Sequence, residues 1–210
     1  MAKQFRGVSR LVFATITEGE NTTTYGTPTA IIGVKAISRD IASDSEQVWA
    51  DNALYEETFA GTSVTRSFET VRLDPAIEAQ LLGLTTVQVA AAGTSTPAVN
   101  AYATPADASN RQYFAFGYAL HDGNADQPCE IVWAFRGKVN SISKSSNTID
   151  AGTGSEGQTI EVTFSAPVNK FTTTAQRNLD LSMPVAADTD VDAWFSQVVT
   201  PDNVATVMGD

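Results

Sequence analysis

The side chains best suited to chemistry in this sequence are its one histidine, His121, and its one cysteine, Cys129. No second histidine or reactive cysteine stands near His121 in sequence to complete a metal site, so we expect it at a surface or interface, with a general-base role left open. Cys129 opens an apolar strand before Ile131 and Trp133, which favours a small core residue over a nucleophile. A single cysteine also excludes an internal disulfide.

Two loop motifs resemble binding sites but lack the context of such sites. Residues 152–157 fit G-x-G-x-x-G, yet a polar loop precedes them and a strand follows, whereas a dinucleotide site needs a strand before and a helix after. Residues 122–126 begin like a calcium loop, but Gln127 and Trp133 stand where that loop needs Gly and Glu, so a hairpin turn is expected. The sequence predicts no enzyme activity, catalytic residue, metal or cofactor.

A run of acidic residues is the clearest signal in the chain. Between positions 40 and 57 there is no basic residue, and six carboxylates occur: Asp40, Asp44, Glu46, Asp51, Glu56 and Glu57. Apolar residues interrupt the run, so it is a structured surface that repels itself and any polyanion. Two interpretations stay open. The charges can keep a solvated strand face from aggregating, or they can form an acidic wall facing a passing polyanion.

Composition narrows the class of protein. The 210 residues carry a formal net charge of −11, which argues against binding that neutralises phosphates and against binding to anionic membranes. Only 18% of residues are charged although 42% are hydrophobic, so we expect part of the surface to be covered by partners. We expect neither a signal peptide nor a membrane span, and therefore a soluble protein folded in a cytoplasm.

Strand patterns dominate the chain, and the sequence predicts one mainly β domain over residues 1–210. They lie at residues 9–16, 30–41, 43–50, 55–60, 62–72, 111–121, 129–142 and 159–166. Gly61 predicts a hairpin turn, with Val64 and Phe68 as inward residues. A short helix is predicted over 74–83, because Asp74 can cap it and Gly83 suits the left-handed position at its end. A second helix is expected at 190–199, and long loops at 90–110 and 143–157.

Several short segments together resemble one protein family. They are Gly7–Ser9 with Leu11–Phe13, Tyr25–Pro28 before Ile32–Val34, Trp49–Tyr55, Leu81–Leu84, Tyr113–Tyr118 and Ile131–Val139. Between residues 7 and 167 the chain resembles the major tail tube protein of long, non-contractile-tailed bacteriophages, the type common in phages of Gram-positive hosts. The Ala-Asp-Asn-Ala-Leu-Tyr segment ending at Tyr55 and the Leu-Leu-Gly helix end are its most specific parts.

The resemblance implies both a fold and an assembly. The fold would be a β-sandwich or barrel-like domain with a flanking helix and a C-terminal arm from about residue 170. Copies would assemble into stacked hexameric rings, forming a virion tail tube through which genomic DNA passes during ejection without specific binding. Partners would be other copies and the tape measure, tail terminator and distal tail proteins. Assembly would occur in the host bacterial cytoplasm, without a membrane.

The acidic run supplies the candidate functional residues. Those expected to face the lumen are Asp44, Glu46, Glu56 and Glu57, and Asp44 should share a face with Glu46 because strand residues alternate. Those expected to pack between subunits are Trp49, Asp51, Asn52 and Tyr55. Two alternatives remain. One is a monomeric β-sandwich binding module, carbohydrate-binding or adhesin-like, with Trp49, Tyr55 or Trp133 as its platform; the other is a different tube-forming tail component.

Overall fold

The computed structural model describes residues 7–50, 53–89, 99–107, 111–123, 127–145 and 157–209, with residues 43–50 and 53–61 described by their backbone alone. In these ranges the chain forms strands and three short helices, which confirms the mainly β prediction. The strands are β1 (Gly7–Glu18), β2 (Thr23–Tyr25), β3 (Thr29–Ala30), β4 (Val34–Ala50), β5 (Ala53–Thr70), β6 (Thr85–Val89), β7 (Val99–Ala103), β8 (Tyr113–His121), β9 (Glu130–Lys144), β10 (Gln158–Phe164) and β11 (Asp180–Pro184). The helices are α1 (Pro75–Leu82), α2 (Val191–Ser196) and α3 (Val204–Met208).

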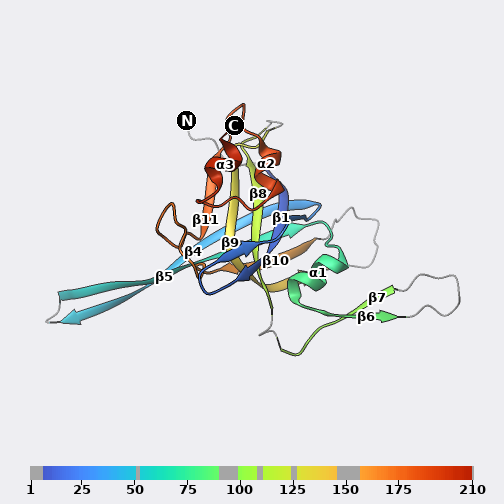
Figure 1. The fold of residues 1–210 in the computed structure, drawn as a ribbon. Helices are drawn as coiled ribbons and strands as arrows, with labels where there is room; N and C mark the ends of the chain where they lie inside the picture. Colours follow the sequence, from blue (N-terminus) through green and yellow to red (C-terminus); the bar gives the residue numbers. More distant parts are fainter. Residues whose placement is uncertain are drawn as a thin grey trace, which may run out of the picture.

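The main sheet is antiparallel and curls toward closure (Figure 1). Its strand order is β2-β1-β8-β9-β10-β5-β4, with β3 added to β1 and β11 added to β9. β3 pairs with β1 and the chain then runs directly into β4, which lies beside β1 and pairs with β5. The last strand of the order, β4, therefore lies against β1 near the other end, and the body is barrel-like.

The central strands are buried on both faces. One face packs on a first core made of Leu11, Phe13, Ile31, Val64, Phe68, Leu73, Leu81, Phe114, Phe116, Tyr118, Val132, Ala134, Val139, Ile160, Val162 and Phe164. The other face packs on a second core made of Val12, Ala14, Ala115, Ala119, Ile131, Trp133, Phe135, Phe171, Trp194, Phe195, Val198 and Val199. The first core fills the barrel, and the second lies beneath the C-terminal segment. Two-sided burial explains why β8 is apolar along its whole length instead of alternating.

The helix α1 confirms its predicted ends. The Asp74 side chain accepts a hydrogen bond from the Ala76 amide at 2.7 Å, and Pro75 occupies the first turn. Gly83 has φ 65°, and the Leu84 amide beyond it donates to the Ala79 carbonyl at 2.8 Å. These contacts satisfy backbone groups that a helix leaves unpaired at its ends, so the local sequence is sufficient to set both boundaries.

Three other predictions need correction. Gly61 is not a turn, because β5 runs through it and the β4–β5 connection falls at residues 51–52. The expected loop 90–110 contains a strand, β7, which pairs with β6. The second predicted helix begins at its Asp190 cap but ends at Ser196, since Gln197 is extended and the two valines that follow are buried in the second core.

The segment after residue 170, expected as an arm, packs on its own chain. Phe171 and the side chains of α2 enter the second core, and β11 pairs with β9 from Glu130 to Ala134. Figure 1 shows α2 and α3 lying beside the ends of β8 and β9. Neither β11 nor α3 was expected from the sequence. No helix in the described ranges is long and apolar enough to cross a membrane.

Candidate functional site

A long two-stranded hairpin projects from the barrel and carries the acidic run. β10 pairs with β5 only between Val64 and Thr70, whereas β4 pairs with β5 along nearly its whole length. In the described part of the chain, β5 from Ala53 to Ser63 therefore pairs with β4 alone. Figure 1 shows the two strands continuing well beyond the body. The distal hairpin thus presents unpaired backbone along both edges, which is the arrangement that recruits another strand.

The candidate residues occupy register positions in this distal part. Glu46 lies opposite Thr58, Val48 opposite Glu56, and Gln47 opposite Glu57, while Trp49 lies opposite Leu54. Asp44 falls at the register shift between Ser43 and Ser45, and Tyr55 at the shift near Trp49. Asp51 and Asn52 lie outside the described residues. The hairpin therefore brings the acidic candidates of both strands onto one projecting element.

A buried arginine fixes the base of the hairpin. Arg66 lies between Val64 and Phe68 on the inward face of β5, and its side chain is only 1% exposed. Its guanidinium carbon is 4.9 Å from the ring centre of Phe164 and 5.7 Å from that of Tyr118. Such stacking suits a planar, weakly hydrated cation, and the stem of Arg66 fills core volume as an apolar residue would.

Asp180 on β11 supplies the counter-charge. It forms an ion pair with Arg66, and its Oδ2 is also 3.5 Å from Nη1 of Arg39 on β4. Burial raises the pKa of Tyr118 beside this cluster, with Arg66 acting in the opposite direction, so the phenol stays neutral. One carboxylate from the C-terminal segment therefore holds two arginines at the root of the hairpin.

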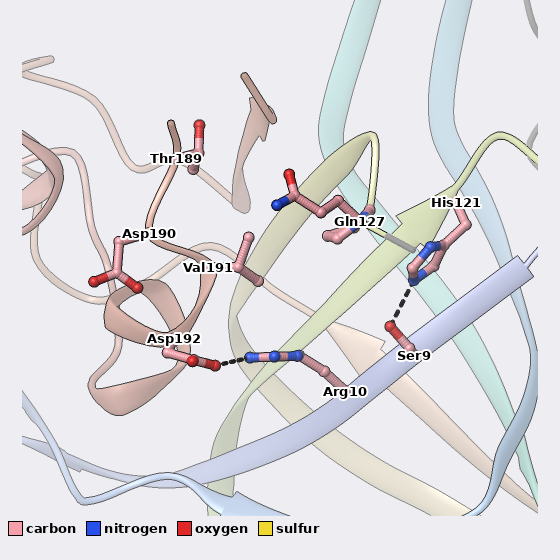
Figure 2. Close-up of a pocket in the computed structure, with 9 residues that line it drawn as sticks. Ser9, Arg10, His121, Gln127, Thr189, Asp190, Val191 and Asp192 are labelled. Atoms are coloured by element: carbon pink, nitrogen blue, oxygen red, sulfur yellow. Dashed lines mark hydrogen bonds and ion pairs between the residues drawn. The ribbon is translucent and has the colours of Figure 1, made fainter. Parts of the chain in front are cut away.

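A polar pocket of about 270 Å³ lies between β1, the end of β8 and the start of α2 (Figure 2). Ser9 Oγ lies 2.7 Å from His121 Nε2, and Arg10 pairs with Asp192. Arg10 has φ 54° at a register shift in β1, and the shift places Ser9 opposite Ala119, on the face of the second core. His121 is half-buried here, consistent with the expected surface or interface position.

The pocket has part of a nucleophilic arrangement. A serine next to a histidine is the pairing that activates a hydroxyl, and a carboxylate usually orients the histidine. In Figure 2, however, Asp192 pairs with Arg10, which lies between it and the Ser9–His121 pair. The described residues hold no cluster of three metal-ligating side chains. The geometry favours a structural link between β1, β8 and α2.

Comparison with known proteins gives only distant structural likenesses. No family model matches the sequence, and no curated protein matches it. A solved structure of the anti-feeding prophage tube-terminating cap shares 8% identity at a TM-score of 0.45, covering 88% of this chain and 95% of that one. A chain from the sheath-tube complex of an extracellular contractile injection system shares 9% identity at a TM-score of 0.41, covering 84% of this chain and 89% of that one. A type six secretion system protein shares 11% identity at a TM-score of 0.32, covering 82% of this chain and 92% of that one.

These values do not establish a family or a shared fold, because every TM-score lies below 0.5. Support for a function therefore comes from the chain's own geometry and from the resemblance of its sequence segments to tail tube proteins.

The structure removes one residue from the binding-module alternative. Trp133 was a candidate platform, but it is fully buried and its Nε1 donates to the Trp194 carbonyl at 2.9 Å. A buried indole cannot stack on a sugar, so that part of the hypothesis is wrong. The side chains of Trp49 and Tyr55 lie outside the described part of the structure. Cys129 is half-buried, with Sγ 3.3 Å from the Leu120 carbonyl, and is not a full core residue.

Sequence reasoning missed the Arg39–Arg66–Asp180 cluster. The sequence held one signal, which was the position of Arg66. It lies two residues after Val64 and two residues before Phe68, which were both expected to point inward. Strand alternation places such a residue inside, where a charge needs a partner. Asp180 itself gave no signal, because it begins a five-residue strand far along the chain. Residues 152–156 of the glycine motif and residues 124–126 of the turn lie outside the described residues.

Proposed function

We propose that this protein is a structural tail subunit that assembles with copies of itself into stacked hexameric rings, forming the tube of a bacteriophage tail. The observation that carries the proposal is the hairpin of β4 and β5, whose distal part projects from the barrel with both backbone edges unpaired in the described structure. Strands joined edge to edge around a ring would satisfy these groups and remove the exposed edges.

The acidic run supports a channel for DNA. A wall of carboxylates cannot replace the counterions on DNA, so the main source of phosphate-binding affinity is absent and DNA can slide. Six copies would multiply the net charge of −11 in each ring. Register places Glu46 and Glu56 on one face of the hairpin, with Asp44 two residues before Glu46. We assign this face to the lumen of the tube. By register, Glu57 lies on the opposite face of the hairpin.

The remaining assignments concern packing and partners. Trp49 and Tyr55 lie in the distal part of the hairpin, where a neighbouring subunit would contact them, and Asp51 and Asn52 stand between them in sequence. The completed tube would meet the tape measure, tail terminator and distal tail proteins of the virion, and it would carry out no catalysis. The sequence resemblance supports these partners, and the projecting tip supports the contact region.

Electron microscopy of the purified protein tests the assembly. Negative staining should show rings or tubes of uniform bore. A protein that stays monomeric at every concentration, salt and pH tried would remove the proposal and leave the monomeric binding module, which glycan affinity measurements would then test.

Charge reversal tests the channel. Replacing Asp44 and Glu46 together by Lys should leave tubes intact but slow DNA release from particles that carry the variant. The control is Glu57→Lys, a single reversal at a register position of the opposite face, which should release DNA at the wild-type rate. Equal release by all three proteins would show that these acids do not line the DNA path.

A further inference from the structure

The hairpin of β6 and β7 has one apolar face that nothing in the described structure covers. The pair forms a separate two-stranded sheet, which Figure 1 shows extending away from the barrel beyond α1. Its register places these residues on one face: Thr85, Val87, Val89, Val99, Ala101 and Ala103. The three valines are half-exposed or more, with Val99 at 63%. The opposite face carries Gln88 and Asn100 among its residues.

This hairpin lacks the usual protection against association. No charged residue occurs from Gly83 to Ala106, in a chain with 24 acidic residues. Exposed strand pairs normally carry charges that keep other chains away, and an isolated two-stranded sheet is only marginally stable in water. An uncharged, valine-faced hairpin is therefore stabilised when another surface covers it.

A second copy of this chain is the occupant that fits. An acidic chain repels copies of itself wherever carboxylates face each other, but the hairpin carries none. The same chain also exposes a complementary apolar patch formed by Ile32, which is 84% exposed, and Val71. Both residues lie beside Gly33: Ile32 precedes it in sequence, and the Val71 amide donates to the Gly33 carbonyl at 2.8 Å. Lys35 and Arg72 flank the patch in sequence, and no acidic residue occurs from Asn21 to Arg39.

We propose that the valine face of the β6–β7 hairpin docks on the Ile32–Val71 patch of a copy in the next ring. This inference rests on the proposed tube, and it names the surfaces that stack one ring on another. The hairpin and the patch are different surfaces, so the contact is heterologous and does not close on itself. A contact of that type continues from ring to ring and gives a tube of open length.

Matched charge insertions on the two faces of the hairpin test this contact. Val87→Glu places a carboxylate in the interface, and the expected result is single rings or stacks at least ten times shorter than wild-type tubes. The control Gln88→Glu adds the same charge to the same strand on the opposite face, and its tubes should keep the wild-type length. Normal tubes from Val87→Glu would overturn the docking proposal while leaving the tube itself intact.

A cysteine pair identifies the two surfaces directly and does not depend on the charged variant. Both proteins carry Cys129→Ser; one also carries Val89→Cys and the other Ile32→Cys. Under mild oxidation the mixture should give a mixed disulfide, and neither protein alone should cross-link. A dimer formed by Val89→Cys alone, or no cross-link in intact tubes, would overturn the assignment. A wild type that forms neither rings nor tubes would overturn the proposed function, and this contact with it.

Discussion

The buried guanidinium of Arg66 on β5 pairs with the carboxylate of Asp180 on β11, 114 residues further along the chain. Arg39 lies directly opposite Arg66 in the β4–β5 ladder, with Nη1 3.5 Å from the same carboxylate oxygen. Like charges opposite each other in a sheet destabilise it, so Asp180 offsets a repulsion at the root of the projecting hairpin. The position of the acidic hairpin therefore depends on docking of the C-terminal segment.

Asp180→Asn should strongly destabilise the fold. It removes the carboxylate while Arg66 stays buried, and an uncompensated buried charge costs about 3–5 kcal/mol in the free energy of unfolding. Urea unfolding measures that loss. Adding Arg66→Met in the same chain removes the buried charge and should recover most of the stability, because Met fills similar volume without needing a partner.

The matched control is Asp192→Asn, which also breaks a pair between a C-terminal aspartate and an arginine of the sheet. Both partners of that pair, Arg10 and Asp192, are well exposed. Exposed pairs contribute about 0–1 kcal/mol, so this variant should unfold close to wild type. Equal losses from the two variants would show that the burial of Arg66 does not govern the energetics of its pair.

The two caps of α1 should account for much of that helix's stability. Asp74→Ala removes the side chain that accepts from the Ala76 amide, and loss of such a cap costs about 0.5–2 kcal/mol. Gln80→Ala, at an exposed interior position of the same helix, is the control and should be neutral or slightly stabilising because Ala favours helix. Thermal unfolding of both variants measures the difference, and indistinguishable melting temperatures would count against the capping role.

The helix was predictable because its signals are local. Asp74, Pro75 and Gly83 satisfy backbone groups within a few residues, so no distant contact is needed to place the ends. Val64 and Phe68 were also placed correctly inside, since strand alternation is a local pattern. Gly61 misled for the opposite reason. Glycine often breaks strands, but here it falls at a register shift of the β4–β5 ladder and β5 continues through it.

Elements that depend on distant partners could not be predicted. β11 is only five residues long, and it forms because β9 offers an edge from Glu130 to Ala134 and the second core accepts Leu181 and Met183. β8 is buried on both faces because the C-terminal segment covers one of them; its continuous apolar run indicates burial on both faces, but nothing within β8 reveals which segment supplies the cover. Arg66 is tolerated inside only because Asp180 reaches it. In each case the deciding contact joins residues far apart in sequence.

Ionisation of the Tyr25 phenol should lower the stability of the protein at alkaline pH. Burial, followed by the nearby charges of Glu18 and Asp202, raises the pKa of this phenol above its ordinary value of about 10. Folding therefore favours the protonated form. The stabilisation is fully present below pH of about 10 and is lost as pH rises through the raised folded-state value. Tyr25→Phe cannot ionise, so its unfolding free energy should fall less between pH 9 and 11 than that of wild type.

Urea unfolding at several pH values checks this prediction, because all other titrating groups are common to the two proteins. Near pH 8 the stabilities should be similar, since the buried Tyr25 hydroxyl has no hydrogen-bond partner in the described structure. Parallel pH profiles for the two proteins would show that Tyr25 does not control the alkaline loss.

Gly117→Ala should test how closely the second core packs on the barrel. A Cβ added at Gly117 would lie 2.9 Å from Val12 Cγ2 and 3.0 Å from the Trp133 ring, closer than side chains normally approach. Trp133 is fully buried, with its Nε1 bonded to Trp194, so it cannot move aside. Overpacking of this kind costs about 1–3 kcal/mol.

The control Gly7→Ala meets only His121 Cβ at 3.5 Å, an ordinary contact, and should unfold like wild type. Chemical unfolding of both variants decides the question, because equal midpoints would mean that Val12 and Trp133 pack loosely enough on β8 to make room for one added methyl group.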